Sequence, residues 1–70
     1  MASGIVKWFD VDRGLGYIRP KDGSKDVIVH IDAVEHAGLF ALIEGEEVTY
    51  DPVRNGRLVP QAEDLKIVED

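Results

Sequence analysis

The chain has 70 residues, no cysteine and a formal net charge of −6. This length permits one small domain, expected over residues 1–70, and the lack of cysteine excludes a disulfide framework and a thiolate metal site. The amino-terminal residues show no signal peptide, and no apolar run approaches the roughly 20 residues of a membrane span, so we expect a cytoplasmic protein with no membrane partner.

Five short segments rich in β-branched and aromatic residues are separated by turn signals. The predicted strands cover residues 5–9, 15–19, 26–31, 46–53 and 58–68, the last interrupted by Pro60. Between the fourth and fifth strands, the Asn55-Gly56 pair favours a two-residue hairpin turn within residues 54–57. A single helical turn is predicted at residues 32–35, capped by Asp32.

Strands at about ten-residue spacing, with almost no helix, predict an all-β barrel or sandwich, and closure of a barrel would protect its edge strands. Alternation in the second strand places Gly16 and Ile18 on one face and Leu15 and Tyr17 on the other. The predicted inward set comprises Val6, Ile18, Val27, Val29, Ile31 and Val48, with some of Val53, Val59, Leu65 and Ile67.

The charges are distributed unevenly along the chain. Residues 1–31 carry five basic and four acidic side chains, whereas residues 32–70 carry three basic and ten acidic ones. An acidic half is typical of a solvated surface that keeps a small protein in solution. The first half therefore holds most of the cations available to a nucleic-acid ligand.

The outward face of the first three strands combines aromatic rings with cations. Its members are Lys7, Trp8, Arg13, Leu15, Tyr17, Ile28 and His30. Rings on a strand surface offer unstacked bases a platform, and neighbouring cations contact phosphates. This pattern predicts binding of single-stranded nucleic acid.

Three segments carry a resemblance to the bacterial cold shock protein family: residues 4–9 (GIVKWF), 13–18 (RGLGYI) and 25–31 (KDVIVHI). Residues 45–48 and 60–62 are similar to that family's later strands. The resemblance implies a five-stranded antiparallel OB-fold barrel that binds single-stranded RNA or DNA and loosens RNA structure. The RNA-recognition motif has the two ribonucleoprotein motifs in the opposite order and needs two helices, so it is discarded.

By position, the resemblance carries nucleic-acid contacts onto six residues: Lys7, Trp8, Arg13, Tyr17, Asp26 and His30. The predicted site adds Phe9, which is ambiguous between rim and core, together with Leu15, Ile28 and Phe40. Strict alternation would place Lys7 and Trp8 on opposite faces, so their shared role implies a bulge or strong twist in the first strand.

The sequence departs from the family where stacking rings are usual. Leu15, Ile28 and Ile31 replace aromatics of the platform, Leu39 replaces a loop aromatic, and Asp10 replaces an asparagine. Phe40 stands where a lysine is common. If three stacks are each weakened by about 1 kcal/mol, affinity falls by roughly two orders of magnitude. A weak, sequence-tolerant binder is therefore expected.

An alternative hypothesis gives the same apolar side chains to a protein partner. Leu15, Ile28, Leu39 and Phe40 would form a docking or self-association surface. A monomer is expected, with strand exchange through residues 37–45 as an alternative. No nucleophile–base pair, phosphate-cradling loop or metal-ligand spacing is present, so neither an enzyme nor a cofactor or metal site is predicted.

Overall fold

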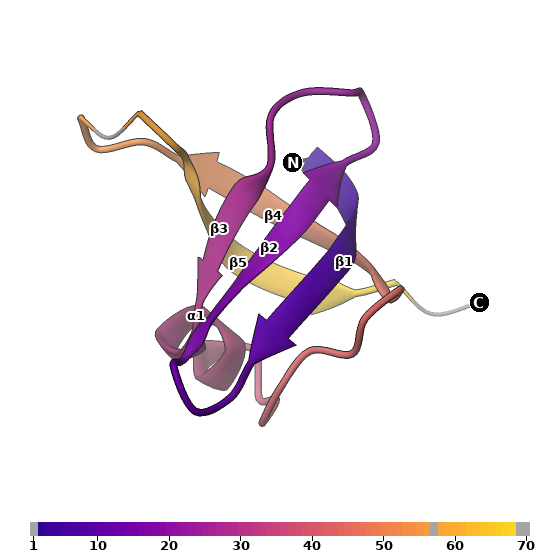
Figure 1. The fold of residues 1–70 in the computed structure, drawn as a ribbon, viewed down its shortest axis with the longest axis vertical. Coiled ribbons are helices and arrows are strands. Elements are labelled where there is room, and N and C mark those ends of the chain that lie inside the picture. Colours follow the sequence, from indigo (N-terminus) through magenta and orange to yellow (C-terminus); the bar gives the residue numbers. More distant parts are fainter. Residues whose placement is uncertain (1, 57, 69–70) are drawn as a thin grey trace.

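The computed structural model describes residues 2–56 and 58–68, and Arg57 of the predicted hairpin lies outside them. Five strands and one short helix follow each other in the chain (Figure 1): β1 (Ala2–Asp10), β2 (Leu15–Pro20), β3 (Val27–His30), α1 (Ile31–His36), β4 (Glu47–Val53) and β5 (Gln61–Ile67). None of the helices in this part of the chain is long and apolar enough to cross a membrane.

The strands close into a barrel in the order β1-β2-β3-β5-β4, with β4 also paired to β1. The predicted all-β, five-stranded OB-fold barrel is confirmed. One pairing departs from the antiparallel expectation, because β3 and β5 run parallel at Ile28 and Gln61. The Ile28 backbone N–H donates to the carbonyl of Pro60 (3.0 Å), so the residue before β5 contributes to this closure.

The barrel interior confirms Val6, Ile18, Val27, Val29, Val48 and Leu65 as buried core residues. Ile31 and Ile67 are partly buried against this core, but Val59 is 39% exposed and does not belong to it. Val34, Leu42, Tyr50 and Ala62 complete the core and were not predicted. Val34 comes from α1, which closes one end of the barrel (Figure 1).

The fifth strand begins three residues later than predicted. Asn55 and Gly56 have positive φ (46° and 79°), as a hairpin turn of this type requires, but pairing resumes only at Val53 and Gln61. The connection between β4 and β5 is therefore longer than a tight hairpin, and residues 54–56 and 58–60 of it lie outside both strands. Asp64, with φ of 51°, lies at an irregularity of β5, which lets Ala62 and Leu65 both face the core.

Helix α1 starts earlier than the prediction placed it. Its N-cap is His30, whose Nδ1 accepts a hydrogen bond from the Asp32 backbone N–H at 3.2 Å. The prediction of Asp32 as the cap is therefore wrong. The helix has six residues instead of the predicted four. It begins at Ile31, which was assigned to the preceding strand and which packs on the core.

Gly16 allows β1 and β2 to approach closely at the bulge of β1. A Cβ at this position would lie 2.6 Å from both Phe9 Cδ1 and the Trp8 carbonyl oxygen. Neither distance is compatible with van der Waals contact, so any side chain here would push β1 away from β2.

Gly16→Ala should lower the free energy of unfolding by about 1–3 kcal/mol, since overpacking forces the backbone to shift. Thermal denaturation would show a fall of roughly 4–8 °C in Tm for each kcal/mol. Adding Phe9→Val removes the ring atom that blocks the new methyl group, so the double variant should recover part of the loss. A single variant as stable as the wild type would contradict the close approach.

Tyr50 is the largest fully buried side chain of the barrel. Burial raises the pKa of its phenol, and the nearby Asp22 carboxylate raises it further. The folded pKa therefore lies above the unfolded value of about 10. The corresponding stabilisation is complete below that value and is lost as the pH rises above it.

The free energy of unfolding should fall between about pH 8 and about pH 11 more steeply in the wild type than in Tyr50→Phe. Urea denaturation at both values measures the difference. Tyr17→Phe, which alters a half-buried tyrosine on the outer surface, is the matched control and should keep the wild-type dependence. Equal alkaline losses in the wild type and Tyr50→Phe would refute this role of the buried phenol.

Candidate nucleic-acid interface

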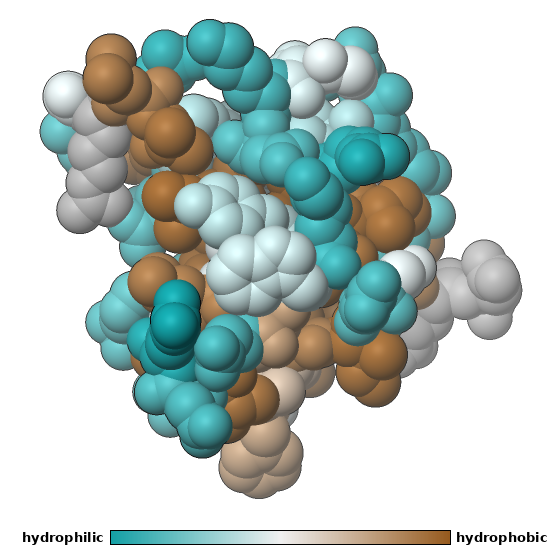
Figure 2. All heavy atoms as spheres, viewed as in Figure 1, coloured by the Kyte–Doolittle hydropathy of each residue, from teal (hydrophilic) through white to brown (hydrophobic). Residues whose placement is uncertain are grey.

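Two rows of side chains cross the outer face of β1, β2 and β3. The strand register aligns Trp8, Tyr17 and Ile28 in one row, and Asp10, Leu15 and His30 in the next. Residues directly opposite each other in antiparallel strands share a face, so these six residues form one surface, here called the platform. Figure 2 views the molecule from this side, with pale side chains of intermediate hydropathy at the centre.

A bulge in β1 brings Lys7 and Trp8 to the same surface. Val6 pairs with Ile18 and Trp8 pairs with Tyr17, so Lys7 is the extra residue between two aligned pairs. Val6 is buried, whereas Lys7 and Trp8 are both exposed. The bulge implied by the family resemblance is confirmed, and it is what joins a cation to the aromatic row.

The two rings of the platform support each other. Trp8 and Tyr17 meet edge to face, with ring centroids 5.2 Å apart and an interplanar angle of 62°. Such pairs contribute about 0.5–1.5 kcal/mol beyond their buried area, which holds both rings in place before any ligand arrives. Trp8 remains 41% exposed, so much of its surface stays open to a base.

Lys7 and Asp26 flank the first row as an ion pair. Lys7 Nζ lies 2.8 Å from an Asp26 carboxylate oxygen, and both side chains are about one-third exposed. A partly exposed pair of this kind contributes little to stability. The pair places a hydrogen-bond donor, the Lys7 ammonium, and an acceptor, the Asp26 carboxylate, beside the first row, where they could contact base edges and phosphates.

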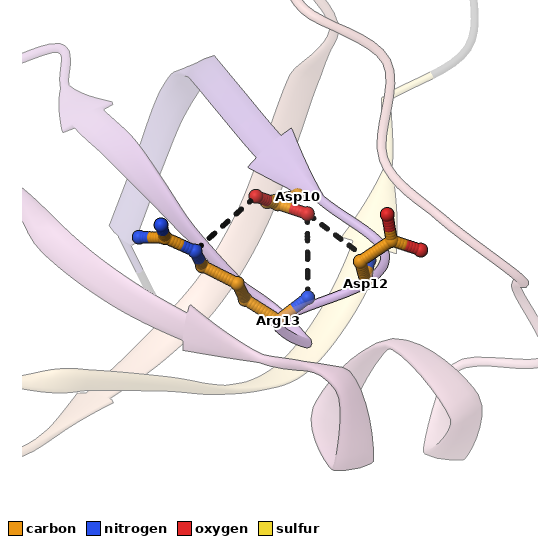
Figure 3. Close-up of polar contacts among 3 residues, drawn as sticks. All are labelled: Asp10, Asp12 and Arg13. Atoms are coloured by element: carbon orange, nitrogen blue, oxygen red, sulfur yellow. Dashed lines mark hydrogen bonds and ion pairs between the residues drawn. The ribbon is translucent and has the colours of Figure 1, made fainter.

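Asp10 organises the loop that carries Arg13 (Figure 3). One carboxylate oxygen accepts hydrogen bonds from the backbone N–H groups of Asp12 (3.0 Å) and Arg13 (3.3 Å). The other lies 3.7 Å from Arg13 Nε. The sequence interpretation treated Asp10 only as a departure from the family pattern. Its position two residues before Asp12 is the local signal for this turn.

His30 serves the platform and the helix together. Because Nδ1 accepts from the Asp32 N–H, a neutral His30 carries its proton on Nε2. The same Nδ1 lies 3.5 Å from an Asp32 carboxylate oxygen. The imidazole is thereby held in one orientation next to Leu15, with a donor available to a ligand.

Two predicted site residues, Phe9 and Phe40, do not belong to the two rows of the platform. Phe9 pairs with Gly16 and packs against the core, so its half-buried ring is on the inner side. Phe40 is 94% exposed in the connection between α1 and β4, and packs on very little of the protein. The strand register and the ion pairs place Lys7, Trp8, Arg13, Leu15, Tyr17, Asp26, Ile28 and His30 on or beside the platform, whereas Phe9 faces inward and the role of Phe40 stays a prediction.

Over residues 2–56 and 58–68, no three His, Asp or Glu side chains are placed to hold a metal ion. The groups that converge on this face are instead two rings, two aliphatic side chains, two cations with their carboxylate partners and an imidazole. Such a surface can stack bases and contact phosphates without any further group.

Comparison with known proteins identifies the family of this chain. A family model described as the "'Cold-shock' DNA-binding domain" matches residues 2–68. The chain is 56% identical over 55 residues to cold shock protein CspA of Rhizobium meliloti, an alignment that covers 79% of this chain and 80% of that protein. It is 42% identical over 67 residues to cold shock-like protein CspB of Escherichia coli, covering 96% and 93%. By fold, motifs and similarity, the chain belongs to the cold shock domain family of nucleic-acid-binding proteins.

Proposed function

We propose that the platform binds single-stranded RNA or DNA through base stacking. The observation that carries this proposal is the row of Trp8, Tyr17 and Ile28, partly open to solvent on one face and bordered by Lys7. Bases laid across this row would meet two rings and an aliphatic surface, with the Lys7–Asp26 pair beside them. Stacking of this kind tolerates any sequence because every base has a π-face.

The proposed binding is weak, because two positions of the platform carry aliphatic side chains instead of rings. Leu15 and Ile28 cover a base without a π-face, and each missing stack is worth about 1–3 kcal/mol. Lys7 and Arg13 are already paired with Asp26 and Asp10, so a phosphate must compete with a carboxylate for each. Weak, sequence-tolerant binding suits a protein that loosens RNA structure and releases it.

The remaining parts of the proposal concern the whole chain. We propose that residues 1–70 act as one cold shock domain, as a monomer and in the cytoplasm, where transcripts are available. Stacking requires no catalytic group, and no reaction is part of the proposed role. The comparisons support the interpretation as a nucleic-acid-binding domain and do not support the alternative of a protein-docking surface.

Trp8→Ala should weaken binding of a labelled single-stranded oligonucleotide by about 1–3 kcal/mol, roughly five- to a hundredfold in Kd, since it removes one stack. Fluorescence anisotropy of the label measures this change. Val68→Ala, which trims another partly exposed apolar residue outside the platform, is the control and should bind like the wild type. An unchanged Kd in Trp8→Ala would refute the platform as the binding surface.

The combined variant Leu15→Phe and Ile28→Phe should tighten binding at least tenfold, because two rings replace two aliphatic contacts beside Tyr17 and His30. The same anisotropy titration applies, with Val68→Phe as a control that adds a ring elsewhere. Binding of both proteins should weaken as salt rises, since phosphate contacts displace counterions. Affinity that holds or increases with salt would instead indicate an apolar protein-type interface.

A further inference from the structure

A pocket of about 770 Å³ lies at the end of the barrel opposite α1. Its lining comes from the loop over residues 21–26 on one side and from residues 54 and 58–60 on the other, at the ends of the strands (Figure 1). The surface is visibly hollowed between these two sides (Figure 2). The volume is within the range of small-molecule sites. We call it the end pocket.

The apolar part of the lining has a buried base, to which Pro20, Val27 and Tyr50 belong, and an exposed part formed by Pro52, Leu58 and Val59. Most of the rest of the lining is polar or charged and includes the Ser24 hydroxyl and the Lys and Asp side chains of the loop over residues 21–26. Apolar surface combined with convergent polar groups is typical of small-molecule sites. The site described above uses none of these apolar lining residues.

The mouth of the end pocket gathers cations in a chain that is acidic overall. Three of the eight Lys and Arg side chains of the sequence, Lys21, Lys25 and Arg54, line it, against Asp22 and Asp26. Lys21 is paired with Glu47, whereas Lys25 and Arg54 are exposed at the mouth. Exposed cations beside an apolar cavity suit a ligand that joins a ring to an anionic group.

The end pocket is continuous with the platform. Asp26 lines the pocket and also pairs with Lys7 beside the first row. Two lining residues are next to Ile28: Val27 precedes it in the chain, and the Pro60 carbonyl accepts a hydrogen bond from its backbone N–H. A strand leaving the platform over Ile28 therefore reaches the mouth of the pocket at the next step.

We propose that the end pocket receives the base of a nucleotide whose phosphate contacts Lys25 and Arg54. This inference rests on the proposed function and extends it by one subsite beyond the platform. The shared chemistry is a planar base joined to a phosphate, supplied either by the next nucleotide of a bound strand or by a free mononucleotide. The test below separates these two sources.

The experiment uses the full chain, labelled with ¹⁵N, and three probes: a short single strand, a longer strand of the same sequence type, and uridine monophosphate. Trp8 fluorescence reports the platform, while the backbone amide signals of Ser24, Tyr50 and Val59 report the end pocket. We expect both strands to quench Trp8, and only the longer strand or the mononucleotide to shift the three amide signals.

Two variants test the contacts directly. Lys25→Gln and Arg54→Gln should each weaken binding of the longer strand roughly two- to fivefold and leave the short strand unaffected, as expected for exposed charge contacts. Lys66→Gln, which removes an exposed cation of β5 outside the pocket lining, is the control. Val59→Trp, which fills the pocket from its loop, should abolish the shifts of Ser24 and Tyr50.

Shifts caused by the longer strand support the strand as the source, and shifts caused by the mononucleotide alone, without Trp8 quenching, support a free nucleotide. Quenching of Trp8 with unmoved pocket signals for every probe overturns the end-pocket inference and leaves the platform intact. Unchanged Trp8 fluorescence and unmoved signals for all three probes overturn both proposals.

Discussion

The platform depends on one extra residue in β1. Because Lys7 interrupts the pairing of β1 with β2, Val6 faces the core while both Lys7 and Trp8 reach the solvent. The close approach of the strands at Gly16 accompanies this bulge, since the Trp8 carbonyl oxygen lies only 2.6 Å from the position that a Cβ of residue 16 would take. Regular alternation would place either the cation or the ring inside the barrel, and the face would lose one of its two means of contacting nucleic acid.

The cations of this face are paired with carboxylates, so their attraction for phosphate is reduced. The cations nearest the rings are held by carboxylates of the same surface, Lys7 by Asp26 and Arg13 by Asp10. These pairs are exposed enough to be opened by a phosphate at low cost. An acidic chain can thus contact a polyanion locally, while its overall charge favours release.

The platform and the core are connected through His30. Its side chain stands beside Leu15 on the outside, and its Nδ1 caps the helix that delivers Val34 to the interior. The imidazole of the proposed interface is therefore directly hydrogen-bonded to the first turn of α1. The edge-to-face contact of Trp8 with Tyr17 gives similar support at the other row, so the groups that would meet a base are positioned before binding.

Five strands, most of the core and the side chains of the platform could be predicted from the sequence, because alternation and turn residues act over a few neighbours. Other features follow from contacts made only in the folded barrel. The parallel closure of β3 on β5 and the late start of β5 after Pro60 depend on groups distant in the chain, whereas the cap at His30 is a local contact with the Asp32 N–H that the sequence pattern did not reveal. The predicted core also lacks Tyr50 and Val34 and leaves Phe9 undecided. Tyr50 follows Val48 by two residues, so alternation alone would have placed it inward, whereas Val34 and Phe9 are assigned inward only by their packing against the closed barrel.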